Sequence, residues 1–138
     1  MKYFIDTNVF LSVAAHDNLE HLNQSKGLLA KIKSGEIDGV TGDIVLAEMN
    51  WVLSSFYKFP KARIVKLLNG VINIPNLEIN NAYNSRSAIR LFGNTNVKYI
   101  DCVIASIPQI VAKEWVVVSY DEDFKKLPVL WKKPSGVK

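Results

Sequence analysis

The sequence contains only one cysteine, Cys102, among its 138 residues. A single cysteine excludes an internal disulfide, a cysteine-based zinc site and an iron–sulfur cluster, so packing must stabilise the fold. No apolar run approaches the roughly 20 residues that a membrane-spanning helix needs. The chain reaches an acid already at Asp6, which is too early for a signal peptide. We therefore expect a soluble, cytoplasmic protein without a membrane partner.

Glycine and proline are also scarce, at seven and five residues, whereas 49% of the residues are hydrophobic and 22% are charged. This composition is typical of one compact globular domain and excludes a collagen-like or disordered chain. The sequence has no internal repeat, low-complexity tract or linker. We therefore expect residues 1–138 to form a single domain.

Predicted strands and helices alternate along the chain. Short β-prone runs between turn residues predict strands over residues 2–5, 40–41, 77–79, 115–118 and, at an edge, 129–131. Apolar residues at helical spacing predict helices over residues 9–15, 18–34, 43–57, 60–72, 81–92 and 100–112. Pro108 is expected to kink or split the last helix. This alternation indicates right-handed βαβ units, and hence an α/β fold with a central, mainly parallel sheet.

Acidic residues gather where strands are expected to end or where helices are otherwise apolar. Asp6 follows the first strand, Asp121 follows the last buried strand, and Asp123 comes two residues later. Glu48 and Asp101 are each flanked by apolar residues within predicted helices. Open parallel sheets bind ligands in the crevice at the carboxyl ends of their strands. These five acids are therefore the candidate functional residues.

Crowded, half-buried carboxylates repel one another and destabilise a fold unless a cation neutralises them. A donor set of oxygen atoms alone, without cysteine or a placed histidine, favours Mg²⁺ or Mn²⁺ over zinc. Two such ions can activate a water and stabilise the leaving oxygen in phosphoryl chemistry. The acids therefore predict a divalent metal site that acts on a phosphate ester.

Four short motifs occur in a fixed order along the chain. They are Asp6-Thr7-Asn8, Ala47-Glu48, the run Asp101–Ser106 and the run Ser119–Phe124. Together they resemble the PIN domain and, more narrowly, the VapC-type toxins of toxin–antitoxin modules. The resemblance extends from Lys2 to about Trp131.

The resemblance implies a three-layer α/β/α fold and an endoribonuclease that uses Mg²⁺ or Mn²⁺. It implies a catalytic, metal-binding quartet of Asp6, Glu48, Asp101 and Asp121, with Asp123 as a further acid of the metal site. It also implies that side chains beside the quartet orient carboxylates or water, namely Thr7, Asn8 and Ser119. In such enzymes a metal-activated water cleaves RNA and leaves a 5′-phosphate. The implied partners are a second copy of the chain and a cognate antitoxin whose tail reaches the acidic pocket.

The chain has 17 basic and 13 acidic residues, which gives a net charge of +4. The charge of the surface outside the predicted metal site is higher, and it suits a polyanionic substrate. Withdrawing five acids into a pocket leaves eight on the remaining surface, whose charge is then about +9. Candidate residues for a phosphate track are Arg86, Arg90, Lys98, Lys125 and Lys126.

Two alternatives to a toxin nuclease stay open at this point. A PIN-like domain can keep the fold and act only by binding RNA or protein, and a PIN nuclease can process RNA without being a toxin. A response-regulator receiver or a haloacid-dehalogenase-type phosphatase fits less well. Such a phosphatase needs a second aspartate at position 8, where this chain has Asn8.

Overall fold

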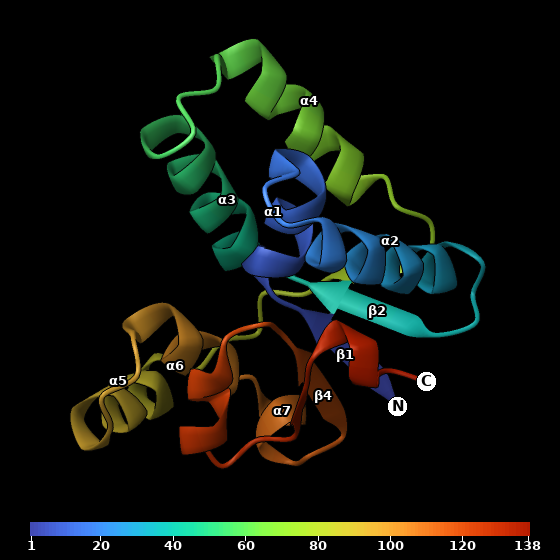
Figure 1. The fold of residues 1–138 in the computed structure, drawn as a ribbon. Helices are drawn as coiled ribbons and strands as arrows, with labels where there is room; N and C mark the ends of the chain where they lie inside the picture. Colours follow the sequence, from blue (N-terminus) through green and yellow to red (C-terminus); the bar gives the residue numbers. More distant parts are fainter.

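Five parallel strands form the central sheet of the computed structural model, which describes residues 1–138 (Figure 1). In chain order they are β1 Lys2–Ile5, β2 Asp38–Thr41, β3 Leu77–Ile79, β4 Trp115–Val118 and β5 Trp131–Lys132. The strands lie in the order β3-β2-β1-β4-β5, and each neighbouring pair is parallel. The expected α/β fold is confirmed, with a sheet that is parallel throughout.

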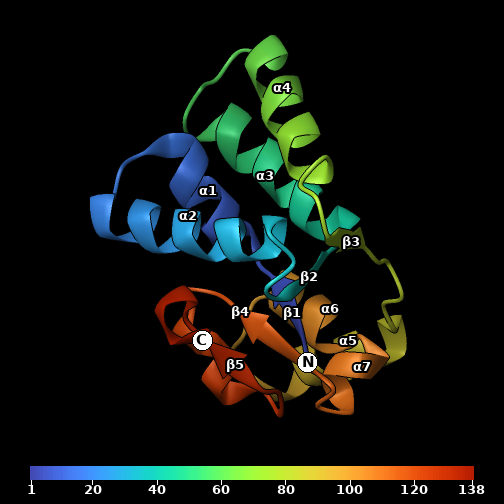
Figure 2. The ribbon, with the colours of Figure 1, turned by 90° about the vertical axis from the view of Figure 1, so that its right-hand side faces the viewer.

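Helices cover both sides of the sheet, and the first four lie on the opposite side from the last three (Figures 1 and 2). The helices are α1 Thr7–Ala15, α2 Leu19–Lys33, α3 Asp43–Ser55, α4 Lys61–Ile72, α5 Ser85–Asn94, α6 Tyr99–Ala105 and α7 Pro108–Val111. Two short 3-10 helices complete the chain, η1 Glu122–Lys126 and η2 Pro134–Gly136. The arrangement is the expected three-layer α/β/α fold. None of the helices combines the length and the hydropathy that crossing a bilayer requires.

The two central strands, β1 and β4, are buried where they approach the candidate site. All four residues of β4 are buried, and Phe4 and Ile5 at the end of β1 have no exposed surface. Strands that are covered by helices on both faces are buried on both sides, and they therefore consist of nearly continuous apolar residues. Leu53 of α3 and Ile104 of α6 are also fully buried. Close packing around these strands holds the residues that directly follow them in defined positions.

The chain between β3 and α5 differs from the helix expected over residues 81–92. The helix begins only at Ser85, after Asn84, whose side chain caps its first turn. The preceding segment is held instead by Asn81 Oδ1, which accepts a hydrogen bond of 2.7 Å from the backbone N–H of Asp43. Asparagine side chains can form hydrogen bonds with backbone groups that compete with helix formation. Here the bond from Asp43 to Asn81 takes the place of the first helical turn that the sequence predicts.

Other boundaries depart from expectation by smaller amounts. The helix expected over residues 43–57 ends at Ser55, and the chain then turns at Lys58 with a φ of 57°. The edge strand expected near residues 129–131 is shorter and shifted, as β5. Pro108 splits the helix after Asp101 into α6 and α7, as predicted, because proline lacks the N–H that would continue the ladder.

Candidate active site

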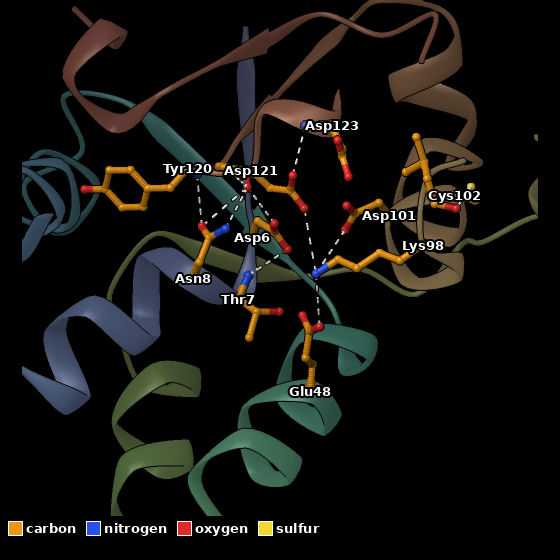
Figure 3. Close-up of polar contacts among 12 residues, drawn as sticks. Asp6, Thr7, Asn8, Glu48, Lys98, Asp101, Cys102, Tyr120, Asp121 and Asp123 are labelled. Atoms are coloured by element: carbon orange, nitrogen blue, oxygen red, sulfur yellow. Dashed lines mark hydrogen bonds and ion pairs between the residues drawn. The ribbon is translucent and has the colours of Figure 1, made fainter. Parts of the chain in front are cut away.

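The strand order places the carboxyl ends of β1 and β4 side by side near the middle of the sheet. From this pair the sheet extends in opposite directions, to β2 on one side and to β5 on the other. Such a switch point forms a crevice that binds ligands in open α/β sheets. Asp6 follows β1 directly, and Asp121 lies three residues beyond the end of β4. Figure 3 shows these side chains together with those of Glu48 and Asp101.

Asp6 is almost fully buried, with 2% of its surface exposed. Its Oδ1 accepts a hydrogen bond of 2.8 Å from the backbone N–H of Thr7, which starts α1. Its Oδ2 accepts one of 2.7 Å from the Ser119 hydroxyl, at the end of β4. The carboxylate is therefore held between the first helix and the neighbouring strand end.

Ser119 and Asn8 connect the two strand ends. Besides donating to Asp6, Ser119 Oγ accepts hydrogen bonds of 3.0 Å from Asn8 Nδ2 and from the backbone N–H of Asp121. Asn8 Oδ1 accepts one of 3.1 Å from the backbone N–H of Tyr120. One buried hydroxyl thus positions two acids. The neighbouring Thr7 contributes its backbone N–H, whereas its buried hydroxyl has no hydrogen-bond partner.

The other acids of the quartet come from three separate elements. Asp101 lies in the first turn of α6 and has no exposed surface, and neither of its carboxylate oxygens has a hydrogen-bond partner. Glu48 projects from α3 with 15% of its side chain exposed. Asp121 caps η1 by accepting a hydrogen bond of 2.9 Å from the backbone N–H of Asp123.

A lysine ammonium lies between these three acids, as Figure 3 shows. Lys98 Nζ is 3.5 Å from Glu48 Oε2, 3.8 Å from Asp121 Oδ2 and 3.9 Å from Asp101 Oδ1. From the sequence, Lys98 was expected only as part of a phosphate track. Its position three residues before Asp101 indicates that the two residues lie near each other, but it does not indicate that the ammonium also faces Glu48 and Asp121.

Asp123 differs from the quartet in its surroundings. Its carboxylate forms an ion pair of 3.1 Å with Lys126, and 42% of its side chain is exposed. Only its backbone N–H reaches the quartet, through the hydrogen bond to Asp121. The role of Asp123 in a metal site stays a prediction.

Burial sets the protonation of the site. It raises the pKa of Asp101 to about 9, and the neighbouring Asp121 carboxylate adds to this effect. Burial also raises the pKa of Asp6 to about 6, although the bonds from Ser119 and Thr7 oppose it. For Asp121, burial is outweighed by the neighbouring Asp101 carboxyl, by the backbone N–H of Asp123 and by Lys98, so its pKa lies below the ordinary value. The site therefore contains carboxyl groups that ionise at neutral pH only at a cost, unless a cation is close.

The sequence also matches a known family. The family model of the PIN domain matches residues 3–130, which include all of the acids described above. The chain belongs to the PIN domain family. No curated protein matches its sequence.

Solved structures share the fold of this PIN domain at low sequence identity. VapBC2 from Rickettsia felis, bound to a promoter DNA fragment, is 20% identical, with a TM-score of 0.64 over 96% of this chain and 98% of that chain. VapBC-1 from nontypeable Haemophilus influenzae is 14% identical, with a TM-score of 0.66 over 98% and 99%. VapC20 from Mycobacterium tuberculosis, a sarcin–ricin loop cleaving toxin, is 14% identical, with a TM-score of 0.65 over 93% and 96%.

The donor chemistry of the PIN domain site fits a divalent metal ion. The four acids of the quartet offer carboxylate oxygens, which hard cations such as Mg²⁺ and Mn²⁺ prefer as ligands. The two unpartnered oxygens of Asp101 are a costly feature that a cation would relieve. In the present arrangement, however, no three acidic, histidine or cysteine side chains are close enough to share one ion. The carboxylates instead surround Lys98.

Proposed function

We propose that this PIN domain is an endoribonuclease that depends on Mg²⁺ or Mn²⁺ and serves as the toxin of a toxin–antitoxin pair. The observation that carries the proposal is Asp101, a fully buried carboxylate without a hydrogen bond to either oxygen. Burial of such a group is costly, and proteins retain it mainly where its charge has a function. Asp101 shares the crevice at the carboxyl ends of β1 and β4 with three further acids.

The proposed metal ligands are Asp6, Glu48, Asp101 and Asp121, with Asp123 as an additional acid. When bound, divalent ions supply an activated water and stabilise negative charge on the phosphodiester. The chain itself supplies orientation. The Ser119 hydroxyl donates a hydrogen bond to the Asp6 carboxylate, and the same oxygen accepts a hydrogen bond from the backbone N–H of Asp121. Asn8 keeps Ser119 in place and bonds to the backbone beside Asp121.

An RNA substrate is supported by the charge around the crevice. Residues 79–100 contain no acid, so the segment that leads to α6 carries only the positive charges of Arg86, Arg90 and Lys98. None of the ion pairs in the structure involves Arg86 or Arg90. Arg86 and Arg90 belong to α5, which packs against the helix that carries Asp101. Unpaired basic side chains on such a neighbouring helix suit a polyanion whose scissile phosphate lies at the acids.

A protein partner is supported by exposed apolar side chains. Trp51 of α3 and Phe56, the residue directly after α3, are 66% and 69% exposed, and an apolar pocket of about 350 Å³ opens between α1, α2 and α4. Exposed apolar patches of this kind often mark the sites where proteins bind each other. Two structural neighbours are VapBC assemblies, so we propose a cognate antitoxin and a second copy of the chain as the partners.

The test is a cleavage assay on a mixture of structured RNAs with Mg²⁺, Mn²⁺ or EDTA, followed by mapping of the product ends. We expect cleavage with either metal, 5′-phosphate ends, and no cleavage in EDTA or by Asp6→Asn. Asp38→Asn is the matched control, because Asp38 is exposed at the start of β2, at the opposite end of the sheet. Cleavage that persists in EDTA would contradict the proposal.

One observation favours a second candidate, a PIN domain that binds RNA or protein without cleaving. Three of the acids already have Lys98 as their cation, and no three acids are within range of one metal ion. The same assay separates the candidates, because a binding module retains RNA in a gel shift without producing ends. Expression without an antitoxin separates a toxin, which arrests growth, from a processing nuclease.

A further inference from the structure

Lys98 stands out because its surroundings are unusual for a lysine. Its ammonium lies within 4 Å of Glu48, Asp101 and Asp121, whereas every other lysine ion pair in the structure joins a lysine to a single acid. Burial disfavours the charged form of Lys98, but the nearby carboxylates outweigh this and raise its pKa. One ammonium therefore faces three acidic side chains.

The local backbone gives no reason for a lysine at this position. Lys98 is the N-cap residue of α6 and makes no side-chain capping hydrogen bond. A positive charge at a helix N-terminus is unfavourable, because the partial charge of the helix dipole there is also positive. Attraction to the acids is the interaction that orients the ammonium into the crevice. The crevice, and not the helix, accounts for its placement.

We propose that Lys98 is the internal counter-ion of the acidic quartet and that a divalent metal ion must displace its ammonium in order to bind. This inference rests on the metal dependence proposed above and adds a residue that sets the metal affinity. The ammonium and a metal ion are drawn to the same three carboxylates. They therefore compete, and the carboxylates close around an ion only when Lys98 has moved away.

Lys98 can leave the crevice at little structural cost. Its side chain is 51% exposed, so a rotation of its flexible stem brings the ammonium into solvent. No backbone hydrogen bond depends on that side chain. The arrangement keeps the acids neutralised while no metal is bound, and it lowers the affinity for metal by the free energy of those ion pairs.

The experiment compares Mn²⁺ binding to the wild-type chain, Lys98→Gln and Lys98→Arg by isothermal titration calorimetry in a metal-free buffer at pH 7.5. We expect Lys98→Gln to bind Mn²⁺ on the order of tenfold more tightly, because the competing cation is gone. Lys98→Arg keeps the charge and is expected to stay within about threefold of the wild type. A residue with a purely structural role would not tighten metal binding when removed.

Lys2→Gln is the matched control for the loss of one positive charge. Lys2 also forms an ion pair, with Glu78 at 2.7 Å, but it lies at the start of β1, at the far end of the sheet from the acids. We expect its Mn²⁺ affinity to change by less than about twofold, as screening over that distance predicts. An equal gain in Lys2→Gln and Lys98→Gln would overturn the inference, as would an unchanged or weaker affinity in Lys98→Gln.

A second measurement keeps the counter-ion role separate from the metal. Without metal, we expect Lys98→Gln to lower the melting temperature, and to lower it less in a Glu48→Gln background, where the acid closest to the ammonium has been replaced by a neutral residue. Equal losses in both backgrounds would overturn the counter-ion role. If the wild type binds no Mn²⁺, the proposed metal-dependent function fails and displacement fails with it. If the wild type binds Mn²⁺ and Lys98→Gln binds it equally, only the present inference fails.

Discussion

The two ends of the sheet use the same kinds of charged residue in opposite ways. At the amino ends of the strands, Lys2 pairs with Glu78 at 2.7 Å, one charge for one, with both side chains more than a third exposed. At the carboxyl ends, Lys98 alone faces several acids at 3.5 to 3.9 Å, and Asp101 among them is fully buried. The first pair is an ordinary surface interaction.

The difference is also visible in the protonation of the acids. The hydrogen bond from Lys2 lowers the pKa of Glu78, so its charged form is favoured. Burial raises the pKa of Asp101 to about 9, so its charged form is opposed. A buried carboxyl group whose ionisation is opposed carries a local cost, and such groups concentrate at functional sites. The opposed ionisation of buried Asp101, more than the mere presence of acids, distinguishes the carboxyl end of the sheet as the site.

Removing a charge at each end should give the largest contrast. Asp101→Asn is expected to lower RNA cleavage by about a thousandfold or more, because it removes a charged metal ligand. Glu78→Gln at the other end is expected to leave cleavage within about twofold. Initial rates on one RNA substrate, at equal folded concentration by circular dichroism, measure both. Comparable losses in the two variants would mean that the acidic crevice is not the active site.

Ser119→Ala should have the next largest effect, because a single hydroxyl orients Asp6 and the backbone of Asp121. We expect cleavage to fall by roughly 10- to 100-fold and stability to fall by about 1–2 kcal/mol. Ser12→Ala is the matched control, since Ser12 is a buried serine that bonds to Ser25 at 2.7 Å within the helical layer. It should lose similar stability but keep its activity. Equal activities in the two variants would refute the positioning role of Ser119.

The acids at the strand ends could be predicted because the pattern of apolar runs already defines a parallel sheet. Once β1 and β4 are neighbours, Asp6 and Asp121 must lie at the same edge. The position of Lys98 could not be predicted in the same way. It depends on how residues 95–98 lead into α6 and on a long side chain with many rotamers, which only the assembled crevice selects.

The start of α5 shows the same limit within the backbone. Local propensity predicts a helix from residue 81, but Asn81 bonds to Asp43, which is 38 positions away in the sequence. Tyr83 likewise lies outside the helix, and its hydroxyl accepts a hydrogen bond of 3.4 Å from the backbone N–H of Ile44, at the start of α3. Such long-range bonds form only in the folded chain and override a weak local preference.

The stability of the metal-free protein should depend on pH in opposite directions at the two ends. A carboxyl whose pKa is higher in the folded than in the unfolded chain opposes folding as pH rises from its unfolded to its folded pKa. For Asp101 that window runs from 3.8 to about 9. We therefore expect Asp101→Asn to be more stable than the wild type at pH 8, by at least about 2 kcal/mol, and nearly equal at pH 4. Urea denaturation in EDTA at both values measures this, and a less stable variant at pH 8 would contradict it.

Glu78→Gln should give the smallest effect and completes the contrast. The pKa of Glu78 is lowered in the folded chain, so its contribution is present above its unfolded value of 4.5 and disappears as pH falls through the folded value. Because the pair with Lys2 is exposed, solvent and salt screen it, and we expect a loss of at most about 0.5 kcal/mol at pH 7 that vanishes in 1 M salt. A loss above about 1 kcal/mol that persists in high salt would show that the amino end also stores electrostatic energy. The asymmetry between the two ends would then no longer distinguish the site from the surface.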